Sequence, residues 1–290
     1  MPELPEVEVI ARGLGKRVKG LTVSKIHINK PEVIKNDNPD GICNLQGKVI
    51  EEISRQGKFI IARFSGGGRI LTHLGMTGKL LVMPTDEEIP IHSHLVFEFM
   101  ENHRRLVYND TRRFGKVLYS LNGEGIIEQE LSELGGDPLK ISSKRFLKIL
   151  KSHKRMIKPL LMDQHVIAGM GNIYADESLF EARIHPRVIS SELSEQEGLT
   201  LYRSIRKILR SAIKAGGSTI NDYCRDDGTM GYFQIKHQVY GKADQPCPRC
   251  GNTIYKMTVG GRTSSVCINC QRPPVVKPTA RVFRDCWWGQ

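Results

Sequence analysis

The chain has 290 residues, 39% hydrophobic and 26% charged, a globular composition that excludes a collagen, a coiled coil or a disordered chain. Its net charge of +12, from 43 Lys and Arg against 31 Asp and Glu, favours a polyanionic partner. Because it contains no apolar run of about 18 residues and the N-terminus is too acidic for a signal peptide, we expect a soluble cytoplasmic protein.

The first half of the chain is predicted to be a short helix followed by strands. Pro5 suits the first turn of a helix, and the apolar residues after it recur at helical spacing. Segments 48–64, 68–83 and 94–110 then alternate or run apolar in short stretches between turn residues. Several short strands at close spacing predict a sandwich or a barrel.

The pattern becomes helical after the Gly135-Gly136 turn. Residues 142–158 form a strongly basic amphipathic segment, and residues 194–215 open on a capping box of Ser and Glu. A glycine-rich turn at 169–171 leads into a further helix. The two halves differ in charge: residues 1–135 carry 18 basic and 18 acidic side chains, and residues 136–290 carry 25 and 13. The excess charge therefore indicates an anion-binding second half.

Four cysteines near the C-terminus have the spacing of a metal site. Two Cys-x-x-Cys pairs supply four thiolates that can converge on one zinc ion, whereas two disulfides would need an oxidising compartment. With four protein ligands no position is left for water, so we expect one structural Zn²⁺ without a catalytic role. The remaining cysteines are predicted to be ordinary thiols. The four predicted ligands are Cys247, Cys250, Cys267 and Cys270.

The extreme N-terminus carries a candidate nucleophile. Removal of Met1 would leave Pro2 as a secondary amine, and an α-amine with a pKa of about 8 is far more often neutral at pH 7 than a lysine is. Condensation of such an amine with an aldehyde carbon gives a cationic iminium, a good electron sink. Glu3 and Glu6 beside it could act as acid and base. The alternative is helix-entry chemistry, with Pro in the first turn and acids at the positive end of the dipole.

Five motifs in a fixed order cover residues 2–271 and carry a family resemblance. They are PELPEVE at 2–8, HLGMTG at 73–78, TRRFG at 111–115, GNIYADE at 171–177 and the four-cysteine module. Together they closely resemble the bacterial formamidopyrimidine-DNA glycosylases (Fpg/MutM), which excise oxidised purines. Leu4 argues against the endonuclease VIII branch, which resembles PEGPE here and prefers oxidised pyrimidines.

The resemblance implies an α+β multidomain fold and assigns catalytic roles. Pro2 would attack the sugar C1′ and form a Schiff base, and Glu3 would assist opening of the sugar ring. Glu6 matches a glutamate at the lesion end of the site, and Lys58 a lysine close to the damaged nucleotide and its phosphate. The implied reaction is base excision with β,δ-elimination. The implied domains are a β-sandwich (1–134), a helical domain with a helix–two-turns–helix motif (135–234), a β-hairpin zinc finger (235–271) and a tail of unknown role (272–290).

The resemblance also implies DNA-binding residues. A flipped nucleotide leaves a gap in the duplex, and Met76, Arg112 and Phe114 match the family's inserting trio. For Met76 and Phe114 the alternative is core packing, and for Arg112 a solvated strand end. Three further residues are predicted to bind phosphates, with an ordinary basic helix face as the alternative for the first: Lys158, Asn172 and Arg262.

Two segments bear on substrate choice or lack a counterpart. Residues 218–233 correspond to the family's lesion-capping region, and the tail 272–290 matches nothing in it. The resulting hypothesis is a monomeric DNA repair enzyme that acts on duplex DNA with an oxidised base in the bacterial cytoplasm, associated with the nucleoid through DNA binding. The alternatives are an oxidised-pyrimidine glycosylase and a catalytically silent DNA-binding protein on the same scaffold.

Overall fold

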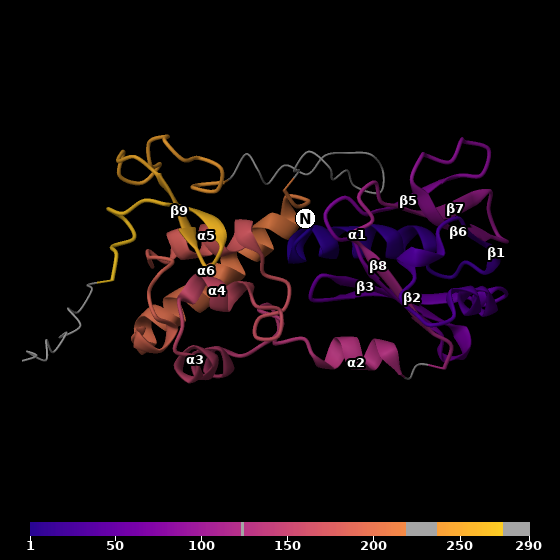
Figure 1. Cartoon of the computed structure of the whole chain (residues 1–290), viewed down its shortest axis with the longest axis horizontal. Coiled ribbons are helices and arrows are strands. Elements are labelled where there is room, and N and C mark those ends of the chain that lie inside the picture. The colour runs from indigo at the N-terminus through magenta and orange to yellow at the C-terminus, as the bar shows by residue number, and fades with distance from the viewer. Residues whose placement is uncertain (123–124, 219–236, 275–290) are drawn as a thin grey trace, which may run out of the picture.

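The computed structural model describes residues 1–122, 125–218 and 237–274. Most of the predicted lesion-capping region and the tail after residue 274 therefore lie outside the described residues. The chain forms two lobes side by side, and its N-terminus lies where they meet (Figure 1). Within the described residues, no helix is long and apolar enough to cross a membrane.

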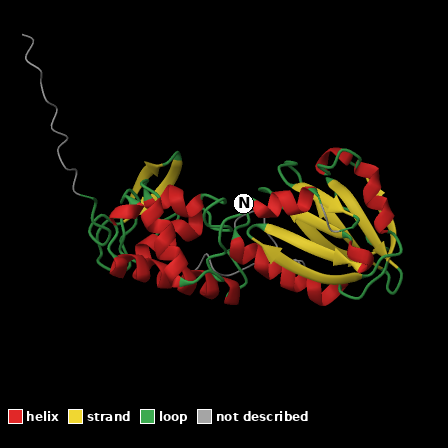
Figure 2. Cartoon of the chain, turned by 90° about the horizontal axis from the view of Figure 1, so that it is seen from below, coloured by secondary structure: helices red, strands yellow, loops and turns green. Residues whose placement is uncertain are grey.

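The first lobe is a β-sandwich preceded in the chain by one helix, and the alternating segments predict such a sandwich. One antiparallel sheet has the order β1-β6-β7-β5 and the other β2-β3-β4-β8, and the two layers are visible in Figure 2. Short 3₁₀ turns lie between strands at Pro31–Val33, Pro39–Leu45 and Ser65–Gly67. The bounds are α1 (Leu4–Val18), β1 (Val23–Ile28), β2 (Ile50–Gln56), β3 (Phe59–Phe64), β4 (Arg69–His73), β5 (Lys79–Pro84), β6 (Ser93–Phe99), β7 (Arg104–Asn109) and β8 (Lys116–Ser120).

Helix α1 belongs to both lobes. Its apolar face, with Val7, Ile10 and Leu14, is buried in the core of the sandwich. Leu4, in the first turn of the same helix, packs instead in the core of the helical lobe. Burial of a leucine side chain contributes about 2 kcal/mol. The first residues of the chain are therefore fixed at the junction between the lobes.

The second lobe is helical, with one departure from the predicted elements. The basic segment 142–158 is not one helix, because residues 153–156 leave the helical conformation between α3 and α4. Pro159 lacks an N–H and would clash with the preceding turn of a continuous helix, so it lies in the first turn of a new one. A 3₁₀ turn at Ser190–Glu192 precedes the last helix. The bounds are α3 (Ser143–Ser152), α4 (Ile157–Met162), α5 (Asn172–Glu181) and α6 (Glu195–Lys214). Helix α2 (Ile126–Ser132) instead packs on the sandwich through Ile127.

The C-terminal module is a β-hairpin packed on α5. Strands β9 (Tyr255–Val259) and β10 (Arg262–Val266) pair antiparallel across the turn at Gly260-Gly261. A small core joins this module to the end of α5 through Phe180. The hairpin is thus held at the same helix whose other end faces the N-terminus of the chain.

Candidate active site and metal centre

The glycine turn at 169–171 receives the start of the chain. The Leu4 N–H donates to the Gly169 carbonyl over 3.0 Å, and Gly169 has a φ of +99° that a side chain would strain. A Cβ on Gly171 would lie 2.3 Å from Cδ of Glu3. Glycine is required at this turn because the N-terminal segment approaches its backbone so closely.

Glu3 is bound by the N-terminus of α5. Its buried carboxylate accepts the N–H groups of Ile173 at 3.0 Å and Tyr174 at 3.4 Å. A helix N-terminus favours an anion, but here the protein supplies its own. Burial nevertheless raises the pKa of Glu3, against the opposing effect of Lys58. These backbone donors at the start of α5 are therefore already occupied.

Asn172 begins α5, but its environment differs from the prediction. Its side chain forms a hydrogen bond with the Tyr240 hydroxyl, and its Oδ1 is buried without a partner among the described residues. Asn172 as a phosphate ligand remains a prediction, and it would have to act through the side chain.

Glu6 lies one helical turn after Glu3 and is enclosed by hydrogen-bond donors. The Tyr174 hydroxyl and the Ser218 N–H, the latter at 2.8 Å, donate to Oε1, and the Glu3 N–H donates to Oε2 at 2.9 Å. Burial, and second the Glu3 carboxylate, raise the pKa of Glu6 to about 7. A carboxyl with this pKa exchanges a proton near neutral pH.

The raised pKa of Glu6 predicts how stability depends on pH. Between pH 4.5 and 7 the folded state holds a proton on Glu6 that the unfolded state releases, so the free energy of unfolding falls as the pH rises. The contribution is about 3 kcal/mol. In Glu6→Gln this part of the decline should disappear, as urea unfolding at pH 4.5, 5.5, 6.5 and 7.5 would measure. Parallel curves for both proteins would contradict the assignment.

Lys58 comes from the turn between β2 and β3 and reaches the same place. It is 6% exposed, and burial lowers the pKa of its ammonium, whereas Glu3 and Glu6 raise it. The fold thus brings together the chain start, two carboxyls and a lysine whose predicted roles belong to one site. Their electrostatic coupling across 55 residues of sequence is visible only in the folded chain.

His73 is a residue that sequence reasoning missed, although it lies in the quoted HLGMTG motif. The Gly75 N–H donates to its Nδ1 over 3.1 Å, and burial together with Lys58 and Lys116 lowers its pKa to about 4. It is therefore a neutral imidazole at pH 7. His73, Lys58 and Lys116 line one cavity of about 260 Å³, together with Glu133 and with Glu130, which pairs with Lys116 at 2.6 Å.

The three predicted inserting residues come together from two loops and are exposed. Met76 is 41% exposed and Phe114 58%, which excludes the alternative of core packing. The Arg112 guanidinium lies over the Phe114 ring, 4.5 Å from its centroid. Exposed apolar side chains at a loop tip are available for contact with another molecule.

Asp110, a second missed residue, holds these two loops together. Its fully buried carboxylate accepts the Thr77 hydroxyl from one loop and, from the other, the Gly115 N–H at 2.9 Å and the Arg112 N–H at 3.3 Å. The Tyr108 hydroxyl also donates to it. One carboxylate thereby fixes Met76 and Phe114 relative to each other.

Lys158 does not have the surroundings of a phosphate ligand. It is fully buried, pairs with Asp176 at 2.7 Å, and donates to the Thr263 carbonyl and the Ser264 hydroxyl. In this conformation it cannot reach a phosphate, because all three partners are internal. Its role here is to join α4 and α5 to the zinc hairpin, and we withdraw it from the phosphate-binding set. Arg262, at the start of β10, is exposed as expected.

The four predicted cysteines form a cluster that fits zinc. Their sulfur atoms all lie within 4.8 Å of one another, with 3.9 Å between Cys247 and Cys270 and 3.5 Å between Cys250 and Cys267. Tetrahedral ligands at about 2.3 Å from Zn²⁺ lie about 3.8 Å apart, whereas a disulfide needs about 2.05 Å. The cluster is therefore built to hold one structural Zn²⁺.

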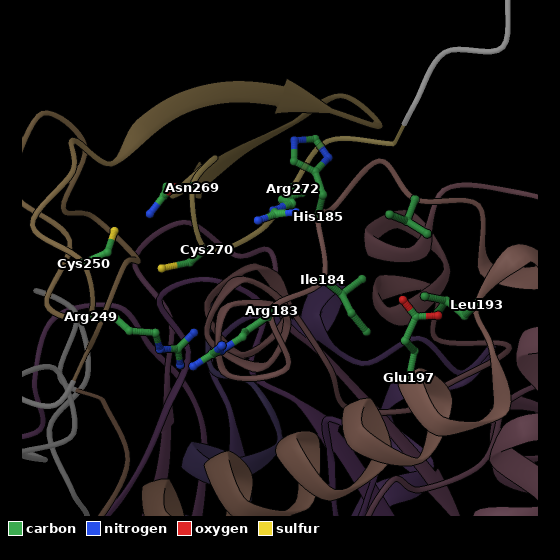
Figure 3. A pocket seen from close by; sticks show the side chains of 11 residues that line it. Arg183, Ile184, His185, Leu193, Glu197, Arg249, Cys250, Asn269, Cys270 and Arg272 are labelled. Carbon is green, nitrogen blue, oxygen red and sulfur yellow. The ribbon is translucent and has the colours of Figure 1, made fainter.

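A cavity of about 600 Å³ lies beside this cluster and carries several arginines (Figure 3). Arg249 packs over the Phe180 ring and donates to its carbonyl, and Arg183 and Arg272 also line the cavity. Four thiolates around one Zn²⁺ carry a net charge of about −2. The guanidinium groups thus lie beside a cluster that would be negative when it holds Zn²⁺, and Arg249 also pairs with Glu181 at 3.6 Å.

The β-sandwich, the helical lobe with its glycine turn and the zinc hairpin define a class, the DNA glycosylases with a helix–two-turns–helix domain and a zinc finger. Three family models match in order: Formamidopyrimidine-DNA glycosylase N-terminal domain (residues 1–117), Formamidopyrimidine-DNA glycosylase H2TH domain (134–224) and Zinc finger found in FPG and IleRS (244–273). The chain belongs to the formamidopyrimidine-DNA glycosylase family.

Individual relatives match this chain over nearly its whole length. The Formamidopyrimidine-DNA glycosylase of Bacillus licheniformis is 37% identical over 276 residues, which cover 94% of this chain and all of the relative. Wild-type Lactococcus lactis Fpg (MutM), solved with N7-benzyl-Fapy-dG containing DNA, superposes with a TM-score of 0.86 at 36% identity. MutM in complex with carbocyclic 8-oxo-G containing DNA gives 0.86 at 35%, and each match covers 94% of this chain and 100% of the other.

Proposed function

We propose that this protein is a bifunctional DNA glycosylase and abasic-site lyase that removes oxidised purines, 8-oxoguanine and formamidopyrimidines, from duplex DNA. Family membership and the lesion-containing DNA bound by its structural neighbours support the substrate class. The observation that carries the proposal is the gathering of the chain start, Glu3, Glu6 and Lys58 at the junction of the lobes.

The proposed reaction uses the Pro2 amine as nucleophile. Its nitrogen forms a bond to C1′ as the glycosidic bond breaks and the base departs with a proton. Glu3, whose pKa burial raises, donates a proton to the ring oxygen, so that the sugar opens and an iminium forms. Loss of a C2′ proton then expels the 3′ phosphate, and a second elimination expels the 5′ phosphate. Water finally releases the amine.

The lysine and the carboxyls have distinct proposed tasks. Lys58 faces the phosphate beside the lesion as a cation, and Glu6 faces the damaged base. Met76, Arg112 and Phe114 fill the gap left by the flipped nucleotide, since a duplex pays several kcal/mol for each unstacked step unless something replaces it. Arg262 and Asn172 are the proposed phosphate contacts. Zinc takes no part in the chemistry.

We propose domain boundaries at 134, 234 and 271, and the separate hydrophobic cores support this division. Two cores lie in the sandwich lobe, one among the helices and one beside the cysteine cluster. Three residues cross these divisions: Leu4 of the first domain and Tyr240 of the third pack with the helical core, and Phe180 of the second packs in the core beside the cysteines. The catalytic residues are therefore proposed to work only when both lobes are in place.

The experiment is excision from labelled duplexes that carry 8-oxoguanine opposite cytosine, thymine glycol, or no lesion. We expect strand cleavage with phosphate on both sides of a one-nucleotide gap for 8-oxoguanine, and much slower cleavage for thymine glycol. Faster cleavage of thymine glycol would favour an oxidised-pyrimidine glycosylase. Binding without cleavage of either lesion would favour a catalytically silent DNA-binding protein.

A further inference from the structure

A buried hydrogen-bonded chain runs from Glu6 away from the junction to a histidine without an assigned role. The Tyr174 hydroxyl donates to Glu6, and the Ser218 hydroxyl lies 3.3 Å from the Tyr174 oxygen. His237 Nε2 is 2.9 Å from the Ser218 Oγ. All four side chains are at least 94% buried. Two side chains, those of Ser218 and Tyr174, therefore connect His237 to the buried Glu6 without a gap in the contacts.

When Glu6 is ionised, one order of donors uses each hydroxyl once as donor and once as acceptor. An ionised carboxylate only accepts, so Tyr174 donates to Glu6 and accepts from the Ser218 O–H. The Ser218 oxygen then accepts the N–H of His237. Burial, with a smaller effect of Lys242, lowers the pKa of His237 to about 4, so its imidazole is neutral at pH 7 and has one N–H to donate.

His237 is itself held in place by neighbours that leave it little freedom. Its ring meets the edge of Tyr240 at 5.7 Å and 88°. The buried Glu177 carboxylate accepts the next three backbone N–H groups, those of residues 238–240, at 2.8–3.0 Å. The charged groups that act on Glu6 are Glu3, at the start of the same helix, and Lys58, from the turn between β2 and β3.

Ser218 gives Glu6 a second attachment to the same unit. Its backbone N–H donates to Glu6 Oε1 over 2.8 Å, while its hydroxyl contacts His237. Glu6 Oε1 accepts two hydrogen bonds, one from the Tyr174 hydroxyl and one from the Ser218 N–H. A shift of Ser218 would therefore change both of them. Gly217 also lies close to Glu6, since a Cβ added there would meet the Glu6 side chain at 3.1 Å.

We propose that His237 is a positioning residue for Glu6, acting through the Ser218 hydroxyl to orient the Tyr174 and Glu6 side chains toward the damaged base. The inference rests on the proposed function in that Glu6 faces the base. It goes further by predicting a separation of two activities. Excision needs Glu6 in place, whereas cleavage of a preformed abasic site has no base to contact and depends on Pro2, Glu3 and Lys58.

The test compares His237→Phe, which keeps an aromatic ring against Tyr240, with His237→Gln, whose amide nitrogen can replace Nε2. In His237→Phe we expect kcat for 8-oxoguanine excision to fall about tenfold, with KM and abasic-site cleavage within about twofold of wild type. His237→Gln should recover most of the excision rate. The apparent pKa of excision should rise in His237→Phe, because the Tyr174 bond that favours ionised Glu6 is loosened.

Equal losses on the two substrates, or no loss on either, would overturn the role of His237. Circular dichroism and thermal unfolding check that the variants fold. If His237→Phe does not fold, Ser218→Ala removes the same link and must show the same separation of activities. A wild-type protein that cleaves neither substrate would instead refute the proposed function, and this inference with it.

Discussion

Blocking the Pro2 amine should abolish the covalent chemistry of this protein. With borohydride and an 8-oxoguanine duplex, protein that lacks Met1 should form a trapped adduct, since reduction converts the iminium at C1′ to a stable amine. Protein that retains Met1, and Pro2→Gly, should lose at least about 10³-fold in the rate of adduct formation. The retained Met1 converts the Pro2 amine into an amide, whose nitrogen cannot attack C1′.

The matched control is a buried lysine outside the proposed site. Lys158→Met removes an amine that is held by Asp176 and the hairpin. The folded fraction of this variant should still form the adduct. Mass spectrometry of the digested adduct should place the modification on residue 2. An adduct of normal yield on Lys58, or on protein that retains Met1, would contradict the nucleophile assignment.

Removal of zinc should abolish DNA binding and leave the sandwich folded. The hairpin carries Arg262 and supplies two of the three partners of buried Lys158, so its collapse also leaves an ammonium without compensation beside Asp176. Structural zinc sites contribute about 10 kcal/mol or more to the folding of small modules. We expect the Kd for an abasic-site duplex to rise at least 100-fold after chelation.

The sandwich should survive because its core shares no residue with the cysteine module. Far-UV circular dichroism should keep most of its β signal, and added Zn²⁺ should restore binding. Cys250→Ser is expected to reproduce the effect of chelation, while Cys43→Ser, which alters a thiol of the sandwich lobe, should bind DNA normally. Unchanged DNA binding by metal-free protein would refute the role of zinc.

Several elements followed from local patterns because local interactions decide them. Ser194 and Glu197 form the capping box that the sequence predicts at the start of α6. The cysteine spacing predicted the metal cluster, and alternation predicted the strands of the sandwich. The prediction of one continuous helical segment over 142–158 was wrong, because helical periodicity does not reveal the break that Pro159 requires.

The candidate site also has a part that the sequence predicted and a part that only the structure shows. The family resemblance marked Pro2, Glu3, Glu6 and Lys58, the first three within the PELPEVE motif at residues 2–8. Sequence could not show that the N-terminus of α5 is filled by the Glu3 carboxylate, nor that Lys158 is buried. Both depend on contacts across more than 100 residues, where no local pattern constrains the partner.

What the sequence by itself determined is the chemistry available: an amine at the second residue, acids beside it, four thiolates and a charge excess of +12 confined to the second half. The tertiary structure decided which groups meet. Burial then set their properties, raising the pKa of Glu6 and lowering that of Lys58 and His73. Desolvation depends on everything packed around a group, and that environment exists only once the two lobes close on the start of the chain.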